Sequence, residues 1–369
     1  MKHTSPFAAA LLSLAFAAGL AAGDRSAAQQ TPDPRIVGGH EAVPFSWPFI
    51  AAIVSAGAPT NYEGQFCGAA LVRPDWVVTA AHCFFGSGTS PEDIKVVLGA
   101  HDLSINDGTR FDATQILLHP DYDPNSNDSD VALIRLATAA NLRPITLNAP
   151  FVSPELSDHL LATAIGWGNT SATGDVFPTR LQQADVPIVP NAVCNAPQSY
   201  GGSITPNMLC AGYASGGIDS CQGDSGGPLV VPDAAVPGGY RQEGVVSFGI
   251  GCAQPDLYGV YARTSNFAYW FSQNICGPSE IPSSTVLSAD VNGPTVSLAW
   301  TDSFAAGPVS YRLYYAPFPG AFPIGVIDLG SATEISVDLP VGTAFYLAVQ
   351  PRNGNCLGAI SNIAFFSVS

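Results

Sequence analysis

Short apolar segments separated by glycine, proline and asparagine dominate the chain from residue 36 onward. Examples are Val96-Val97-Leu98, Val131-Ala132-Leu133-Ile134 and Gly244-Val245-Val246-Ser247. Runs of this length between turn residues are typical of β-strands, and their repeated spacing predicts an all-β fold. The aromatic run Tyr269-Trp270-Phe271 departs from the pattern, and we expect it in a helix that ends this region at residue 276.

A second pattern begins after residues 277–284, where proline and serine in Gly277-Pro278-Ser279-Glu280-Ile281-Pro282-Ser283-Ser284 interrupt any regular element. Residues 285–369 then alternate between apolar and polar positions, as strands of a half-buried sheet do. The sequence therefore predicts a linker and a separate β-sandwich. The expected inward rows are Val296, Leu298 and Trp300; Tyr311, Leu313 and Tyr315; and Phe345, Leu347 and Val349.

The N-terminus has the pattern of a secretory signal. Lys2 and His3 precede an apolar run from Phe7 to Ala22, followed by small residues. This run is shorter than the roughly 20 residues that a membrane span needs. We therefore expect a signal peptide over residues 1–22, with cleavage as late as residue 28, and a secreted, extracellular protein. An uncleaved anchor is the alternative, and no other stretch is long enough to span a membrane.

Composition limits the remaining classes. A length of 369 residues with 47% hydrophobic residues suits two packed domains, and 11% charged residues excludes the usual highly charged disordered chain. The formal net charge of -16 argues against nucleic acid as a partner, because such binding needs a basic surface. Eight cysteines behind a secretory signal predict disulfides, although their pairing does not follow from spacing.

Candidate chemistry is concentrated in Asp219-Ser220-Cys221-Gln222-Gly223-Asp224-Ser225-Gly226-Gly227-Pro228. A serine hydroxyl becomes a nucleophile only when a base accepts its proton and donors stabilise the resulting oxyanion. Two upstream motifs offer the missing partners, namely Thr79-Ala80-Ala81-His82-Cys83 and Asp130-Val131-Ala132-Leu133.

These three motifs, in the order His, Asp, Ser, resemble the trypsin and chymotrypsin family of serine endopeptidases. The resemblance implies two six-stranded antiparallel β-barrels over residues 36–276, with the active site between them. It also implies that Ser225 is the nucleophile, His82 the base and Asp130 its orienting acid, with the amides of Gly223 and Ser225 as the oxyanion hole. Asp128 is a rival for Asp130, but only Asp130 directly precedes the Val-Ala-Leu-Ile strand.

The same resemblance suggests specificity for Arg or Lys before the scissile bond. Asp219 stands six residues before Ser225, where trypsin-like members place a carboxylate at the pocket floor, and Gly249 and Gly259 leave the pocket open. The alternative is that Asp219 caps a turn while an apolar pocket accepts aromatic side chains. We expect the protein to be a monomer, with protein substrates and protein protease inhibitors as its partners. Other expected substrate-binding residues are Ser220, Gln222, Ser247 and Phe248.

Arg35-Ile36-Val37-Gly38-Gly39 resembles the family's zymogen junction, with residues 23–35 as the propeptide. Cleavage after Arg35 would free the Ile36 amine, which in the family enters the interior and pairs with the carboxylate beside the nucleophile, here Asp224. Because Arg35 itself suits the predicted pocket, self-activation is a further hypothesis.

The resemblance also implies three disulfides, Cys67 with Cys83, Cys194 with Cys210, and Cys221 with Cys252. Cys276 and Cys356 are left, and we predict that they pair and thereby join the two domains.

No cofactor is expected. Calcium needs several oxygen ligands, and Ala100 replaces a carboxylate of calcium-binding trypsins, although Asp102 and Asp107 remain in that loop. Family members with tyrosine at the position of Tyr258 often bind sodium, so weak sodium activation is a hypothesis and plain packing of Tyr258 is its alternative.

Residues 285–369 resemble a fibronectin type III sandwich, because a tryptophan lies on an early strand and tyrosines on a middle strand. Phe345 stands where that fold's corner tyrosine is expected. The sequence leaves open whether this domain binds a partner or acts as a spacer. For the whole chain, the alternative to an active protease is a protease-shaped binding or adhesion protein without catalysis.

Overall fold

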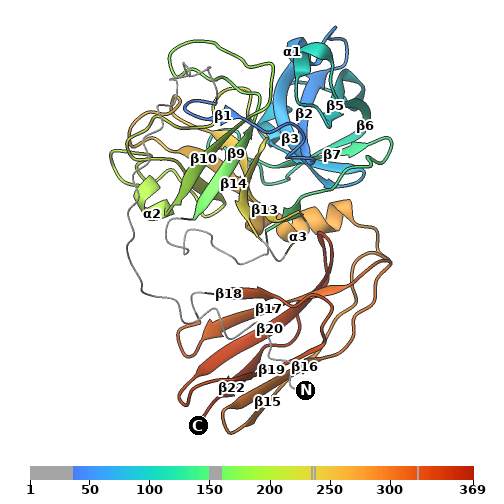
Figure 1. Ribbon diagram of the computed structural model, residues 1–369, viewed down its shortest axis with the longest axis vertical. Coiled ribbons are helices and arrows are strands. Elements are labelled where there is room, and N and C mark those ends of the chain that lie inside the picture. The colour runs from blue at the N-terminus through green and yellow to red at the C-terminus, as the bar shows by residue number, and fades with distance from the viewer. Residues whose placement is uncertain (1–35, 149–159, 234–235, 237, 322–323) are drawn as a thin grey trace, which may run out of the picture. The chain divides into compact units, whose positions relative to one another are not determined.

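The computed structural model describes residues 36–148, 160–233, 236, 238–321 and 324–369 (Figure 1). The predicted signal peptide, the propeptide and Arg35 lie outside these residues. Strands make up most of the described elements, so the all-β prediction is confirmed. No described helix has the length and apolar character that crossing a bilayer would require.

Six strands close into the first barrel, in which every neighbouring pair is antiparallel. The apolar runs of the sequence form its walls; in β2, for example, five consecutive residues from Ile50 to Val54 are buried. In barrel order the strands are β2 (Ile50–Ser55), β3 (Gln65–Arg73), β4 (Trp76–Thr79), β7 (Ala132–Leu136), β6 (Thr109–Leu118) and β5 (Ile94–Leu98).

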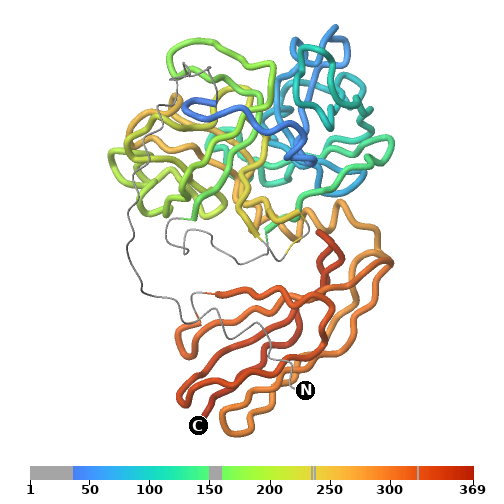
Figure 2. The backbone as a smooth tube through the Cα atoms, viewed as in Figure 1, coloured from blue at the N-terminus to red at the C-terminus, as the bar shows by residue number. Residues whose placement is uncertain are grey.

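The second barrel follows in the chain, as the colours of Figure 2 trace. Pairing of β9 with both β10 and β12 closes the sheet, which confirms the expected two-barrel architecture. Its strands in order are β9 (Leu161–Gly166), β10 (Gln182–Val189), β11 (Met208–Ala211), β14 (Gly259–Arg263), β13 (Tyr240–Phe248) and β12 (Pro228–Pro232). Two short strands extend it, β1 (His40–Glu41) on β10 and β8 (Thr146–Leu147) on β13.

The described part of the chain has three α-helices, besides short 3₁₀ turns. Two are single turns, α1 (Asn61–Gly64) and α2 (Asn191–Cys194). The third, α3 (Thr264–Ile275), has 12 residues and contains the expected Tyr269-Trp270-Phe271 run. It buries Phe267, Phe271 and Ile275 against the apolar core that includes the first barrel, which explains why an apolar aromatic run here is helical.

Residues after the linker form two antiparallel sheets around a separate apolar core. One sheet has the order β15 (Leu287–Asn292), β16 (Thr295–Trp300) and β19 (Glu334–Asp338). In the other, β17 (Ser310–Pro317) and β20 (Ala344–Asn353) are central, flanked by β18 (Gly325–Asp328), β21 (Cys356–Leu357) and β22 (Ala364–Ser367). The three inward rows expected from the sequence all contribute to this core.

Four disulfides join the eight cysteines in the expected pairs, Cys67–Cys83, Cys194–Cys210, Cys221–Cys252 and Cys276–Cys356. The last joins the end of α3 to β21. Next to it, Asn355 donates to the carbonyl oxygens of Val72 and Ile145 at 2.9 Å and accepts from the Leu147 amide at 2.9 Å. The turn between β20 and β21 is thus held by a covalent bond and by three hydrogen bonds.

Candidate active site

His82 and Asp130 form a hydrogen-bonded pair on the first barrel. His82 lies in a short 3₁₀ helix, Ala81–Cys83, directly after β4, and Asp130 lies just before β7. Asp130 Oδ2 is 2.7 Å from His82 Nδ1, and Asp130 Oδ1 accepts the His82 backbone amide at 2.8 Å. Ser247 Oγ donates to Asp130 Oδ2 at 2.5 Å. The carboxylate is fully buried with three donors, which fixes both its own orientation and that of the imidazole.

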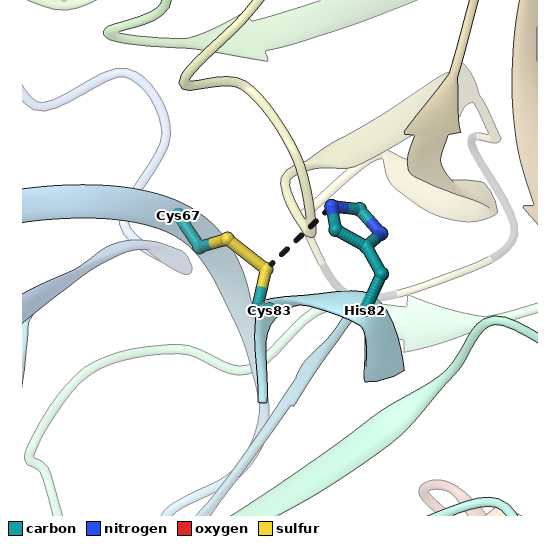
Figure 3. Close-up of side chains that lie close together, drawn as sticks. All are labelled: Cys67, His82 and Cys83. Atoms are coloured by element: carbon teal, nitrogen blue, oxygen red, sulfur yellow. Dashed lines mark hydrogen bonds between the residues drawn. A yellow bond between two sulfur atoms is a disulfide. The ribbon is translucent and has the colours of Figure 1, made fainter. Parts of the chain in front are cut away.

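The other imidazole nitrogen, Nε2, lies beside the Cys67–Cys83 disulfide. Figure 3 shows this nitrogen directed toward the Cys83 sulfur, at 4.0 Å. The carbonyl oxygen of Ser225 is also 4.0 Å from that sulfur, so the disulfide brings the histidine and the serine segment to one place. The two cysteines and His82 are close enough to hold a metal, but their sulfurs are bonded to each other and lack the thiolate charge that a metal ligand requires.

The segment that carries Ser225 packs backbone to backbone against the first barrel. The Gly68 amide donates to the Ser225 carbonyl at 2.7 Å. A Cβ on Gly226, whose φ is +82°, would come within 2.2 Å of Thr79 Oγ1. A Cβ on Gly68 would lie 3.0 Å from the Cα of Gly227. The glycines around Ser225 are therefore required by this close approach as well as by the turn.

Gly223 and Ser225 carry the amides that the sequence assigns to the oxyanion hole. Neighbouring amides are used within the loop: Asp224 donates to the Cys221 carbonyl at 3.0 Å and Gly227 to the Asp224 carbonyl at 2.8 Å. Among the described residues, no backbone acceptor faces the amides of Gly223 or Ser225. Gln65 Nε2 donates to the Gly223 carbonyl at 2.8 Å, which holds the peptide between Gly223 and Asp224 in place.

A hollow of about 210 Å³ opens beside Ser225. Gly259 lines it, and a Cβ on Gly259 would come within 2.7 Å of Asp219 Oδ1. Its other lining residues include every predicted substrate-binding residue except Asp219 itself, namely Ser220, Gln222, Ser247, Phe248 and Gly249.

Asp219 is 4% exposed, and only one of its oxygens has a donor in the described structure. The Ala253 amide donates to Oδ2 at 2.9 Å, while Oδ1 is buried without a partner. Burial away from water raises the pKa of Asp219 to about 7. The carboxylate therefore has an oxygen next to Gly259 without a hydrogen-bond donor, and a cationic group could supply that donor.

Asp224 is also buried, but both of its oxygens accept hydrogen bonds. Its oxygens accept the amides of Gly168 at 2.8 Å and Cys221 at 3.0 Å, and it is 1% exposed. A Cβ on Gly166 or Gly168 would come within 2.4 Å of the carboxylate, so glycines are needed there. Burial raises the pKa of Asp224 to about 6, because two backbone donors do not replace the hydration of a full charge.

The segment after the predicted activation junction packs against the loop that carries Asp219. Ile36 is fully buried, and the Val37 carbonyl accepts the Asp219 amide at 3.1 Å. A Cβ on Gly38, whose φ is +71°, would lie 2.3 Å from the Gly217 carbonyl oxygen. The chain that follows the junction thus helps to shape the wall that carries Asp219.

Other predicted positions lie at the edges of the site. The ring of Phe248 contacts the ring of Tyr200 edge-on at 6.0 Å, and Tyr200 Oη donates to the Tyr258 carbonyl at 2.6 Å. Tyr258 is 5% exposed and belongs to the same apolar cluster. In the loop considered for calcium, the Asp107 carboxylate accepts the His101 and Gly108 amides, both at 2.8 Å.

Some residues of this region were not predicted from the sequence. A second hollow of about 330 Å³ borders Gly223 and is lined by Tyr62, Gln65, Phe66 and Phe177. Tyr62 Oη donates to the Phe177 carbonyl at 3.1 Å, so two segments far apart in the sequence close over it. Single aromatic residues carry no recognisable signal in the sequence, and Gln65 and Phe66 are notable only because they precede Cys67, a predicted disulfide cysteine.

Comparison with known proteins agrees with this geometry. The sequence model of the family described as "Trypsin" matches residues 36–271. A trypsin of Xenopus laevis is 38% identical over 245 residues, which cover 66% of this chain and 91% of that protein. Trypsin-3 of Salmo salar is 37% identical over 66% of this chain and 94% of its own length. Serine protease 1 of Homo sapiens is 37% identical over 67% of this chain and 92% of its own length.

Proposed function

Since the chain belongs to the trypsin family of serine proteases, we propose that it is a secreted endopeptidase that cleaves peptide bonds after Arg or Lys. The observation that supports this specificity is the buried Asp219 carboxylate. Its Oδ1 has no partner among the described residues and lies beside Gly259, which lines the hollow next to Ser225. A substrate guanidinium or ammonium would supply the missing donor and the opposite charge. An apolar side chain would leave this oxygen unsatisfied, at a cost of about 1–3 kcal/mol.

The proposed chemistry divides the site residues by role. His82 Nε2 accepts the Ser225 proton as Oγ attacks the carbonyl carbon of the scissile bond, and the negative charge moves to the carbonyl oxygen. The amides of Gly223 and Ser225 stabilise that oxyanion. The C–N bond then breaks, His82 gives its proton to the leaving amine, and an acyl-enzyme remains. Water hydrolyses the ester by the same steps and restores the Ser225 hydroxyl.

Asp130 keeps the imidazole in the tautomer that leaves Nε2 free to accept a proton, through its 2.7 Å contact with Nδ1. It also stabilises the imidazolium that forms in the transition state, because its own charge is buried and held by three donors.

We propose that the protein is made as a zymogen. Among the described residues, Asp224 accepts hydrogen bonds from backbone amides alone, and Ile36 and Val37, the first two residues after the junction, are themselves buried. An ammonium group released by cleavage after Arg35 would compensate that charge and stabilise the loop that carries Gly223 and Ser225. Because the same cleavage site has Arg before the bond, one activated molecule could process others.

The C-terminal sheets support the proposed likeness to a fibronectin type III domain. Eight strands divide between two antiparallel sheets, three in the order β15-β16-β19 and five in the order β18-β17-β20-β21 with β22 also paired to β20. The ring centroids of Trp300 and Tyr311 lie 5.8 Å apart. Four disulfides fit an oxidising, extracellular compartment.

The test is kcat/KM of the processed protein, with Ile36 at its N-terminus, on matched amide substrates ending in Arg, Lys, Phe or Ala. We expect preference for Arg and Lys, complete loss of turnover in Ser225→Ala, and covalent labelling of Ser225 by a fluorophosphonate. Preference for Phe would retain the mechanism and reject the role of Asp219. Absence of both turnover and labelling would favour the binding-protein alternative.

A further inference from the structure

Asp128 lies two residues before Asp130, but its carboxylate contacts the second barrel instead of His82. Thr205 Oγ1 donates to Asp128 Oδ1, and Asn207 Nδ2 donates to Asp128 Oδ2 at 3.0 Å. Ser129 Oγ donates to the same Oδ2 at 3.1 Å. Thr205 and Asn207 belong to the segment that leads into β11, so the bonds of Asp128 cross from one barrel to the other.

The receiving segment is itself firmly held. The Arg263 amide donates to the Asn207 carbonyl at 2.8 Å, and Arg263 Nε donates to the Pro206 carbonyl at 3.0 Å. Asn266 Nδ2 donates to Asn207 Oδ1 at 3.1 Å. Arg263, at the end of β14, is 4% exposed. Asp128 therefore attaches to a rigid part of the second barrel, and not to a mobile loop.

The segment that carries Asp128 is also constrained. Asn127 and Ser129 have positive φ values of 55° and 57°, a left-handed conformation that is unfavourable for most residues without tertiary support. Tyr122 Oη donates to Asn127 Oδ1 at 3.0 Å on the first-barrel side. The side-chain bonds of Asp128 supply support from the other side.

We propose that Asp128 is a positioning residue for the reaction, because it fixes the Asp130 segment to the second barrel, which carries Ser225. The proposal rests on the proposed protease activity. His82 and Asp130 come from the first barrel and Ser225 from the second, so their alignment depends on contacts between the barrels. Asp130 makes one such contact, with Ser247, and Asp128 makes two more within two residues of it.

Reaction rate depends steeply on this alignment, since a displacement of about 1 Å can cost roughly 100-fold in rate. Releasing Asp128 removes none of the hydrogen bonds that His82 and Asp130 make, but it loosens the segment that holds Asp130 in place. We therefore expect a moderate loss in the chemical step, and little change in substrate binding.

The test compares Asp128→Asn with Thr205→Val, which removes only the hydroxyl on the opposite side. Active sites are counted by burst titration, so that misfolded protein does not enter kcat. On an Arg amide substrate we expect kcat per titrated site to fall roughly tenfold in each variant, with KM changed by less than about twofold. The acid limb of the pH profile of kcat/KM should move to lower pH, because a loosened Asp130 stabilises the imidazolium less. The double variant should lose little more than either single variant.

Two further variants separate positioning from general loop damage. Thr205→Ser keeps the hydroxyl and should retain nearly full kcat. Asp123→Asn makes the same chemical change in the same loop, but in the described part of the chain the Asp123 carboxylate bonds only within the loop, to Asn125 and Ser126. We expect it to leave kcat per site within about twofold of the parent value.

Unchanged kcat per titrated site in both Asp128→Asn and Thr205→Val would overturn the proposal, and so would an equal loss in Asp123→Asn. Failure of the parent protein to titrate at all would instead reject the protease function on which the proposal rests.

Discussion

The two barrels each bury a carboxylate at the site, but they satisfy it to different degrees. On the first barrel, Asp130 accepts three hydrogen bonds and has no exposed surface. On the second, Asp219 accepts a hydrogen bond from the Ala253 amide at Oδ2, and its Oδ1 has no partner among the described residues. A complete set of donors holds a charge in a fixed orientation, whereas a missing donor leaves a place for a ligand.

The difference also appears in the energetics. Burial raises the pKa of Asp219 to about 7, which means that the folded protein resists ionising it. A bound cation would stabilise the ionised carboxylate, whereas an uncharged substrate group would not. The free energy spent on burying Asp219 therefore favours cationic substrates over neutral ones. Asp224 shows the same principle within the chain, because the cation proposed to compensate it is the protein's own new N-terminus.

The largest expected effect is that of a substitution at Asp130, the carboxylate with a full set of donors. Asp130→Asn should lower kcat about 10⁴-fold, which is the known loss for the same change in the Ser-His-Asp triad of this family, because the amide favours the wrong imidazole tautomer. The loss should be equal for Arg and Phe substrates, as steady-state kinetics on both would show. A loss confined to Arg substrates would mean that Asp130 acts in substrate binding, and would contradict the distinction between Asp130 and Asp219.

The next largest effect is that of a substitution at Asp219, the carboxylate whose Oδ1 lacks a donor among the described residues. Asp219→Asn should lower kcat/KM for Arg substrates roughly 10²- to 10³-fold, because a buried charge pair contributes about 2–5 kcal/mol. Its kcat/KM for a Phe substrate should stay within about threefold of the parent value. Steady-state kinetics on both substrates checks this pattern. Equal losses on the two would show that the substitution disturbs the site in general.

A smaller effect concerns pH. Benzamidine, a small cation, should bind to the ionised form of Asp219, whose pKa is about 7. We therefore expect its Kd to rise about tenfold for each pH unit below that value. Titration calorimetry on the Ser225→Ala protein from pH 8 to pH 5 measures this. A Kd that stays constant over the range, in a protein that remains folded, would contradict the prediction.

The smallest effect concerns stability. Because the folded-state pKa of Asp219 is raised, its contribution to stability is present at low pH and is lost as pH rises through about 7. In the Ser225→Ala background, adding Asp219→Asn should therefore raise the free energy of unfolding at pH 8. At pH 4 the two proteins should unfold alike. Urea denaturation at both pH values provides the measurement, and a gain that appears only at pH 4 would reverse the assigned sign.

Much of this site could be predicted from local sequence. Ser225, His82 and Asp130 stand in short motifs whose residue types have few other uses together, and Asp219 keeps a fixed spacing from Ser225. Asp128 shows the limit of that reasoning. The sequence presents it only as a rival for Asp130, whereas in the structure its carboxylate bonds to Thr205 and Asn207, some 80 residues away in the chain.

The sequence by itself determined the all-β class, and it predicted the reactive residues and a boundary near residues 277–284, because apolar periodicity and short motifs are local properties of the chain. Only the tertiary structure decided which oxygen of Asp219 lacks a donor, which glycines admit a close backbone approach, and how Tyr62 meets Phe177. Those features depend on contacts between segments distant in sequence, and burial and pairing arise only when the chain brings such segments together.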